Sequence, residues 1–187
     1  MIEKVERQTA WELLSHYNKS EALRKHGLAV EGVMRHFAKL YEEDEEVWGV
    51  IGLLHDLDYE MYPEEHCVKS QELMKKHAVP ELYIRATASH GYGIVVDIKP
   101  ETNAEKVLYT IDELTGLVAA SALMRPSKSV MDLEVKSVKK KFKTASFAAG
   151  VDRQVILNGC EMLGRDLDDV IEHTILGMQE VHEAIGL

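Results

Sequence analysis

The sequence has 187 residues, of which 45% are hydrophobic and 29% are charged, and its formal net charge is −10 at pH 7. This length suits one domain with a sizeable core, and the negative charge argues against a protein that coats nucleic acid, because phosphate backbones require a broad positive surface. No apolar run approaches the roughly 20 residues of a membrane span. The N-terminus lacks a signal-peptide pattern, and the two cysteines, Cys67 and Cys160, form no CxxC motif. We therefore expect a cytoplasmic protein that binds neither membranes nor nucleic acid.

The distribution of apolar residues predicts an all-α chain. Apolar side chains recur at helical spacing along most of the sequence, and Ser20 is a suitable N-cap for a helix that starts at the next residue. Only residues 94–96 resemble a strand. The predicted helices cover residues 5–17, 21–41, a segment ending at 55–56, 63–78, 80–90, 104–123, 152–163 and 167–185. We expect one helical bundle over residues 1–187, with a core at about 20–120 and the helices of 125–187 packed on it.

The most informative stretch is residues 49–60, where a buried helix ends in His55-Asp56 and Asp58 follows two positions later. An imidazole and a carboxylate at the end of a buried helix are costly to desolvate without partners. A metal ion removes this cost, because both groups are common ligands of first-row metals. A lone His-Asp pair also occurs as a simple helix-end hydrogen bond, so the interpretation depends on further ligands elsewhere in the chain.

Further polar residues lie on apolar helix faces. His26 shares a stripe with Leu23 and Val30, and Asp112 lies four positions after Leu108. A buried carboxylate such as Asp112 implies a partner. The complete set of such residues comes from five predicted helices and consists of His26, His55, Asp56, His66, His90 and Asp112. Six ligands are too many for one tetrahedral ion, but they suit two ions that share a carboxylate. Asp56 is the natural bridge.

These residues resemble the metal-binding pattern of the HD superfamily, which is named for its His…His-Asp…Asp motif. The four core residues of that motif correspond to His26, His55, Asp56 and Asp112, and the resemblance covers about residues 20–120. The additional histidines, His66 and His90, match the members that bind a second metal. The resemblance implies an all-α bundle of the HD type and metal-dependent hydrolysis of a phosphate ester or anhydride. It also implies a small phosphorylated substrate, such as a nucleotide, and two divalent ions drawn from Mn, Fe, Ni, Co or Zn, with Mg as a further option.

The sequence departs from particular HD subfamilies after the His-Asp pair. Phosphodiesterases of the His-Asp-x-Gly-Lys type carry Gly and Lys where this chain has Asp58 and Tyr59. Nucleotidase-like members place a glutamate where this chain has Tyr59, with Glu60 one position further. The exact substrate class therefore stays open. Asp58 or Glu60 could orient the attacking water or accept its proton, although acidic residues in such a loop are commonly just solvated.

Residues 125–153 form a basic segment, with eight basic and three acidic residues in a chain whose net charge is −10. A solvated helix face explains such a run, and a patch that attracts an anionic substrate is the alternative. Arg125 and Lys128 follow the helix of Asp112 directly, so we assign them to phosphate contact. Compensation of a helix C-terminus is the competing interpretation.

Two other functions agree with the same ligand set. Some HD-fold proteins use six such ligands for a di-iron oxygenase, and others bind a nucleotide as non-catalytic sensors; the complete ligand set argues against a sensor. The last helices could form a homodimer interface. Cys67 is interpreted as a small buried side chain. The remaining histidines lack carboxylate partners at ligand spacing and are interpreted as surface or packing residues; they are His16, His36, His77, His173 and His182.

Overall fold

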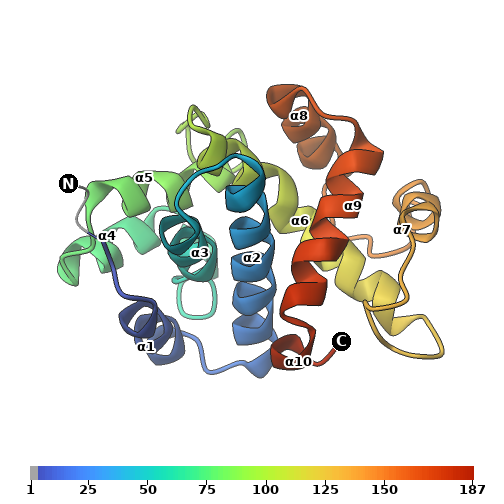
Figure 1. Cartoon of the computed structure of the whole chain (residues 1–187). Coiled ribbons are helices and arrows are strands. Elements are labelled where there is room, and N and C mark those ends of the chain that lie inside the picture. The colour runs from blue at the N-terminus through green and yellow to red at the C-terminus, as the bar shows by residue number, and fades with distance from the viewer. Residues whose placement is uncertain (1–3) are drawn as a thin grey trace.

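The computed structural model describes residues 4–187, and this part of the chain is built from α-helices and short 3₁₀-helices without a strand (Figure 1). The prediction of an all-α, single-domain helical bundle is confirmed. The helices are α1 (Arg7–Tyr17), α2 (Glu21–Leu40), α3 (Glu45–Leu54), η1 (Pro63–Glu65), α4 (Lys69–Lys76), α5 (Glu81–Ala88), η2 (Ser89–Gly91), α6 (Asn103–Leu123), α7 (Val135–Phe142), α8 (Arg153–Leu163), α9 (Leu167–Glu180) and α10 (His182–Ile185). None of the helices in this range combines the length and apolarity needed to cross a membrane.

Helix α2 runs through the middle of the bundle and packs against α3, α6 and α9. In Figure 1, α1, α3, α4 and α5 lie on one side of α2, and α7, α8 and α9 lie on the other. The core face of α2 includes Val33, Met34 and Phe37, each fully buried. Ser20 begins the helix by accepting a hydrogen bond from the Leu23 backbone N–H, as predicted. Sequence-encoded capping therefore sets where the central helix starts.

Helix α6 is the longest helix, and it packs against α2, α8 and α9. It starts with a capping box, in which Thr102 accepts from the Glu105 N–H and the Glu105 side chain accepts from the Thr102 N–H. Because neighbours cover it on several sides, α6 buries residues around most of its circumference. Asp112 therefore sits in the middle of a helix that its neighbours cover on most sides.

Several predicted helices are interrupted in the structure. The helix expected at 63–78 forms as η1 and then α4, separated by a turn in which Cys67 has a φ of 63°. An L-residue in that left-handed region cannot continue a helix, so His66 lies in a turn. The helix expected at 80–90 ends as α5 and continues as η2, and that expected at 167–185 divides into α9 and α10. The strand-like run at 94–96 makes only a single bridge, from Val96 to Tyr92.

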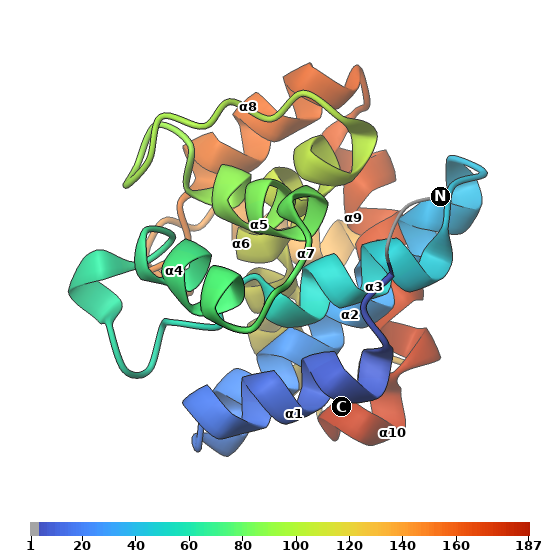
Figure 2. The same ribbon diagram turned by 90° about the vertical axis from the view of Figure 1, so that its left-hand side faces the viewer.

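The segment that joins η2 to α6 runs beside α8, as Figure 2 shows. Residues of this segment, including Tyr92, Ile94 and Lys99, share a hollow with Asn158 and Met162 of α8. Helix α8 in turn packs closely on α6, where Gly159 faces Thr110. The connecting segment and α8 also border the cavity that Asp112 lines, through Ile94, Val95 and Val155.

The closeness of α6 and α8 yields a testable prediction. A Cβ at Gly159 would come within 2.8 Å of the Thr110 Cα atom, whereas a Cβ at Gly116 would meet no heavy atom within 4 Å. We expect Gly159→Ala to lower the free energy of unfolding by about 1–3 kcal/mol, because backbone must shift. Gly116→Ala is the matched control and should be neutral or stabilise by up to about 1 kcal/mol. Urea denaturation of both variants tests this, and equal stabilities would contradict it.

Candidate metal centre

Six side chains from separate parts of the chain converge at the base of one cavity. His26 comes from α2, His55 caps the C-terminus of α3 and Asp56 follows it. The other three residues come from the turn after η1, from η2 and from α6; they are His66, His90 and Asp112. All except the fully buried His55 line a cavity of about 300 Å³. The structure thus brings together every residue predicted as a metal ligand.

The first group consists of His26, His55 and Asp112. The Nε2 atom of His26 lies 3.2 Å from Nε2 of His55 and 2.9 Å from Oδ1 of Asp112. His55 Nε2 is 3.2 Å from the same Asp112 oxygen. The Oδ2 atom of Asp56 completes the group, at 3.3 Å from His55 Nε2 and 3.7 Å from His26 Nε2. Four potential metal-ligand atoms therefore lie close together around one point.

The second group consists of His66 and His90, whose Nε2 atoms are 3.0 Å apart. The Oδ1 atom of Asp56 lies 3.5 Å from Nε2 of His66 and 3.6 Å from Nε2 of His90. Asp56 therefore stands between the two groups and turns one carboxylate oxygen toward each.

Hydrogen bonds behind the rings determine which nitrogen atoms are free. Nδ1 of His55 lies 2.7 Å from the carbonyl oxygen of Gly52, and Nδ1 of His90 contacts the carbonyl oxygen of Thr87. Nδ1 of His66 lies 2.8 Å from a carboxylate oxygen of Asp58. In each pair the ring nitrogen must donate, so the neutral ring presents a bare Nε2 lone pair on its other side.

These lone pairs face other acceptors instead of donors. In the neutral tautomers, His66 Nε2 and His90 Nε2 point lone pairs at each other, and His55 Nε2 faces oxygens of Asp56 and Asp112. Acceptors that face one another inside a protein are unfavourable unless a proton or cation lies between them. Ligands 2.0–2.2 Å from one ion are separated by roughly 3.0–3.6 Å, which matches these contacts. The residues therefore fit metal ions at both groups.

The carboxylates strongly perturb the titration of this cluster. Burial opposes the charged form of His55, but Asp56 and Asp112 outweigh burial and raise its pKa well above the ordinary value. Burial likewise opposes ionisation of Asp112, yet His55 and His26 lower its pKa far below the usual range. His90 has fewer compensating contacts, and burial lowers its pKa. The positive charge of a protonated ring and the negative charges of the carboxylates thus stabilise one another.

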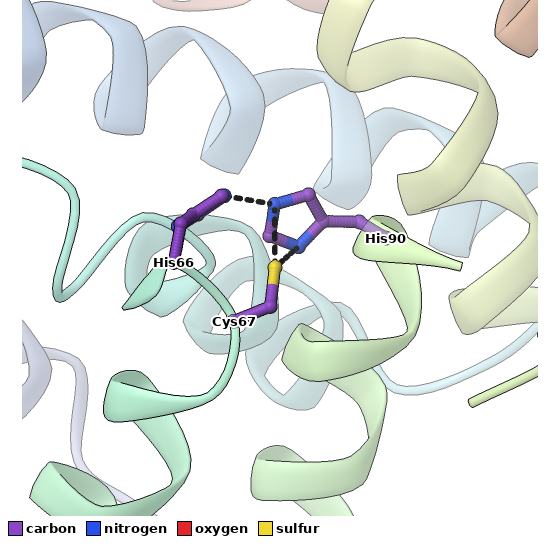
Figure 3. A group of neighbouring side chains, drawn as sticks. All are labelled: His66, Cys67 and His90. Carbon is purple, nitrogen blue, oxygen red and sulfur yellow. Dashed lines mark hydrogen bonds between the residues drawn. The ribbon is translucent and has the colours of Figure 1, made fainter. Parts of the chain in front are cut away.

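Cys67 lies beside the second group, with its sulfur atom against the His90 ring (Figure 3). Its Sγ atom is 3.5 Å from Nε2 and 3.9 Å from Nδ1 of His90. These distances place the sulfur beside the edge of the ring that carries both nitrogens, and the ligand atoms of His66, Cys67 and His90 all lie within 4.8 Å of one another. Burial also raises the pKa of the thiol, which keeps it protonated. Cys67 thus packs on a candidate ligand, as a small buried side chain.

The structure gives Asp58 and Glu60 roles other than the predicted contact with an attacking water. Asp58 is fully buried; one oxygen faces His66 Nδ1 and the other accepts from the Ser70 N–H at 2.8 Å. It therefore orients His66 from behind. Glu60 is exposed and accepts from the Lys19 and Ser20 N–H groups before α2. Neither carboxylate lines the cavity, because backbone donors hold both elsewhere.

The predicted phosphate contacts, Arg125 and Lys128, also lie away from the cavity. Helix α6 continues for three turns beyond Asp112, so Arg125 is roughly 20 Å from it at 1.5 Å per residue. The Arg125 guanidinium instead pairs with Asp132, 2.9 Å away, and Lys128 is exposed in the following turn. The correction follows from the length of α6, which carries both residues to the opposite end of the bundle.

Sequence reasoning missed several residues that line the cavity. Glu113 and Gly116 follow Asp112 on α6, and Tyr109 precedes it by nearly one turn. Helical spacing is the available signal, since residues three and four apart share a helix face: Tyr109 and Gly116 lie three and four positions from Asp112, and Glu113 lies four positions after Tyr109. Tyr59, Ile94, Val95 and Val151 come from loops, for which no periodic signal exists, whereas Val155 lies on α8, a helix that the apolar spacing predicts.

Two of the remaining histidines, His36 and His173, have carboxylate neighbours in the fold. His36 on α2 lies 2.7 Å from a carboxylate oxygen of Glu180 and 3.0 Å from His173 of α9. His173 also lies 3.6 Å from Asp169. These contacts join α2 to α9, so both histidines are packing residues with partners from a distant part of the sequence.

Comparisons of the chain with protein-family models, with curated proteins and with solved structures return no match. The geometry of the two groups is therefore the basis for a functional assignment.

The contact between Asp58 and His66 yields a second prediction. In Asp58→Asn, the amide N–H₂ can donate to His66 Nδ1, which moves the ring proton to Nε2 and blocks that metal ligand. We expect the metal affinity of the second group to fall about 10–100-fold, as measured by calorimetric metal titration.

Glu60→Gln is the matched control for this titration. This variant also replaces a carboxylate by an amide close to His55 and Asp56 in the sequence, but the Glu60 side chain contacts the backbone just before α2 and not a candidate metal ligand. It should lower the free energy of unfolding by about 1 kcal/mol and leave the metal affinities of the first and second groups unchanged. Equal loss of metal in the two variants would contradict the orienting role of Asp58.

Proposed function

We propose that this chain is a metal-dependent phosphohydrolase with an HD-type dinuclear centre, acting on a small phosphorylated molecule. The observation that supports it most directly is the position of Asp56, whose Oδ2 faces His26 and His55 while its Oδ1 faces His66 and His90. A carboxylate that divides its oxygens between two groups of bare lone pairs is suited to bridge two cations. The resemblance of the sequence to the HD superfamily points to the same chemistry.

The ligand chemistry favours transition metals. The two groups contain four imidazole nitrogens and two carboxylates. Imidazole suits Fe, Ni and Zn, and carboxylate oxygens suit Mn, whereas Mg²⁺ prefers an all-oxygen shell. Two such ions would polarise a water molecule toward hydroxide and neutralise the charge of the phosphoryl oxygens.

The chain itself positions these groups. Gly52 and Thr87 carbonyls hold the rings of His55 and His90, and Asp58 holds His66. Each ring is therefore oriented before any ligand binds, which reduces the cost of assembling the centre. The cavity above the ligands, about 300 Å³ in volume, can admit a small phosphate ester to the open side of both groups.

Metal content provides the decisive test. We expect about two equivalents of metal in the wild type, loss of both in Asp56→Ala, and loss of about one each in His26→Ala and His66→Ala. His16→Ala is the control, because His16 is an exposed histidine of α1; it should retain both ions. We also expect the rate of phosphate release from a panel of phosphate esters, with added Mn²⁺, Co²⁺ or Ni²⁺, to fall in Asp56→Ala. The loss should exceed roughly 100-fold, which is the upper end for replacing a residue that only supports a metal ligand.

Two results would contradict the proposal. Tightly held iron without phosphate release would favour a di-iron oxygenase built on the same ligands. Absence of metal from the wild type, even after reconstitution, would exclude a metal-dependent function.

A further inference from the structure

The walls of the cavity above the candidate metal ligands lack the positively charged side chains that commonly bind phosphate. Among the described residues that line it, none is a lysine or an arginine. Apart from the ligand residues, its walls are glycines and the side chains of Tyr59, Ile94, Val95, Tyr109, Val151 and Val155, with one further carboxylate. A phosphoryl group here would have its charge neutralised at the metal centre, with no help from basic side chains.

That further carboxylate belongs to Glu113, the neighbour of Asp112 on α6. Its Oε2 atom accepts a hydrogen bond from the Asp152 backbone N–H at 3.2 Å, which fixes the side chain at the cavity wall. In the described part of the chain, its Oε1 atom has no hydrogen-bond partner. Glu113 therefore offers a half-buried acceptor to whatever occupies the cavity.

Gly116 leaves room for an occupant one turn along the same wall. It lies inside α6, where glycine is less favourable than alanine, and a Cβ there would meet no heavy atom within 4 Å. The carboxylate of Glu113 and the open surface at Gly116 thus form one face of the cavity, next to the metal ligands.

We propose that the substrate is a phosphate monoester whose organic part is uncharged or positively charged and places a hydroxyl or ammonium group against Glu113. This inference rests on the proposed phosphohydrolase function. Two divalent ions would be balanced by the Asp56 and Asp112 carboxylates together with one phosphate dianion. A second phosphate or a carboxylate would then face Glu113 with no cation to offset it, and like charges repel strongly at partly buried positions.

Binding of phosphonates that cannot be hydrolysed as esters tests this selectivity. The probes are propylphosphonate and three relatives with a terminal hydroxyl, ammonium or carboxylate: hydroxypropylphosphonate, aminopropylphosphonate and phosphonopropionate. Calorimetry on the metal-loaded wild type should show the hydroxyl and ammonium compounds binding at least about tenfold more tightly than phosphonopropionate. Glu113→Gln should reduce this ratio, and Glu113→Lys should reverse it. Glu172→Lys makes the same charge change at an exposed position of α9 and should leave the ratio unaltered.

A second variant tests where the organic part lies. Gly116→Leu fills the open surface, so it should weaken propylphosphonate binding at least about tenfold while inorganic phosphate still binds. Equal affinity of the wild type for all four phosphonates would overturn the inference, and phosphate-ester hydrolysis in the same preparation would leave the proposed function standing. Wild-type affinity of Gly116→Leu for propylphosphonate would likewise overturn it. Absence of both phosphonate binding and ester hydrolysis would overturn the proposed function itself.

Discussion

The site depends on one electrostatic constraint, the enclosure of several lone pairs that face one another around Asp56. Bare imidazole nitrogens of His66 and His90 approach to 3.0 Å, and His55 faces two carboxylates. Such an arrangement is unfavourable in a folded core unless protons or cations compensate it. The rest of the bundle keeps these groups together: apolar packing fixes α2 and α6, and backbone carbonyls of Gly52 and Thr87 orient the rings of His55 and His90.

The scaffold and the site therefore oppose each other in free energy. Helices α2, α3 and α6 bury extensive apolar surface around the candidate ligands, which stabilises the fold, while the candidate ligands lose hydration on burial, a cost that protons or cations shared among them must offset. Hydrogen bonds to the Gly52 and Thr87 carbonyls satisfy Nδ1 of His55 and His90, so only Nε2 of each of these two rings lacks a partner from the backbone. Cation binding to such a preorganised cluster would contribute directly to stability, since the unfolded chain has no comparable site.

The central part of the fold and the convergence of His26, His55, Asp56 and Asp112 could be predicted, because the helices that carry or precede these residues have periodic apolar patterns. His26 and Asp112 lie on apolar faces of long helices, and His55-Asp56 ends another, so helical spacing is enough to select them. The turn that carries His66 could not be predicted, because it depends on a left-handed conformation at Cys67 that no propensity indicates. The contact between His36 and Glu180 joins residues far apart in sequence, and only the packing of α9 on α2 creates it.

The basic segment shows why charge composition is a weak guide to a binding site. Arg153 directs its guanidinium to backbone carbonyls of Phe142, Thr144, Phe147, Ala148 and Val151. It thereby holds the loop whose Gly150 and Val151 line the cavity. Lys139 pairs with Asp168, and Lys141 donates to the Ser121 carbonyl. These cations are engaged in shaping and bracing the C-terminal half. In the proposed enzyme, recognition at the cavity would fall to groups that composition does not reveal, the Glu113 carboxylate and the open surface at Gly116 beside the candidate metal ligands.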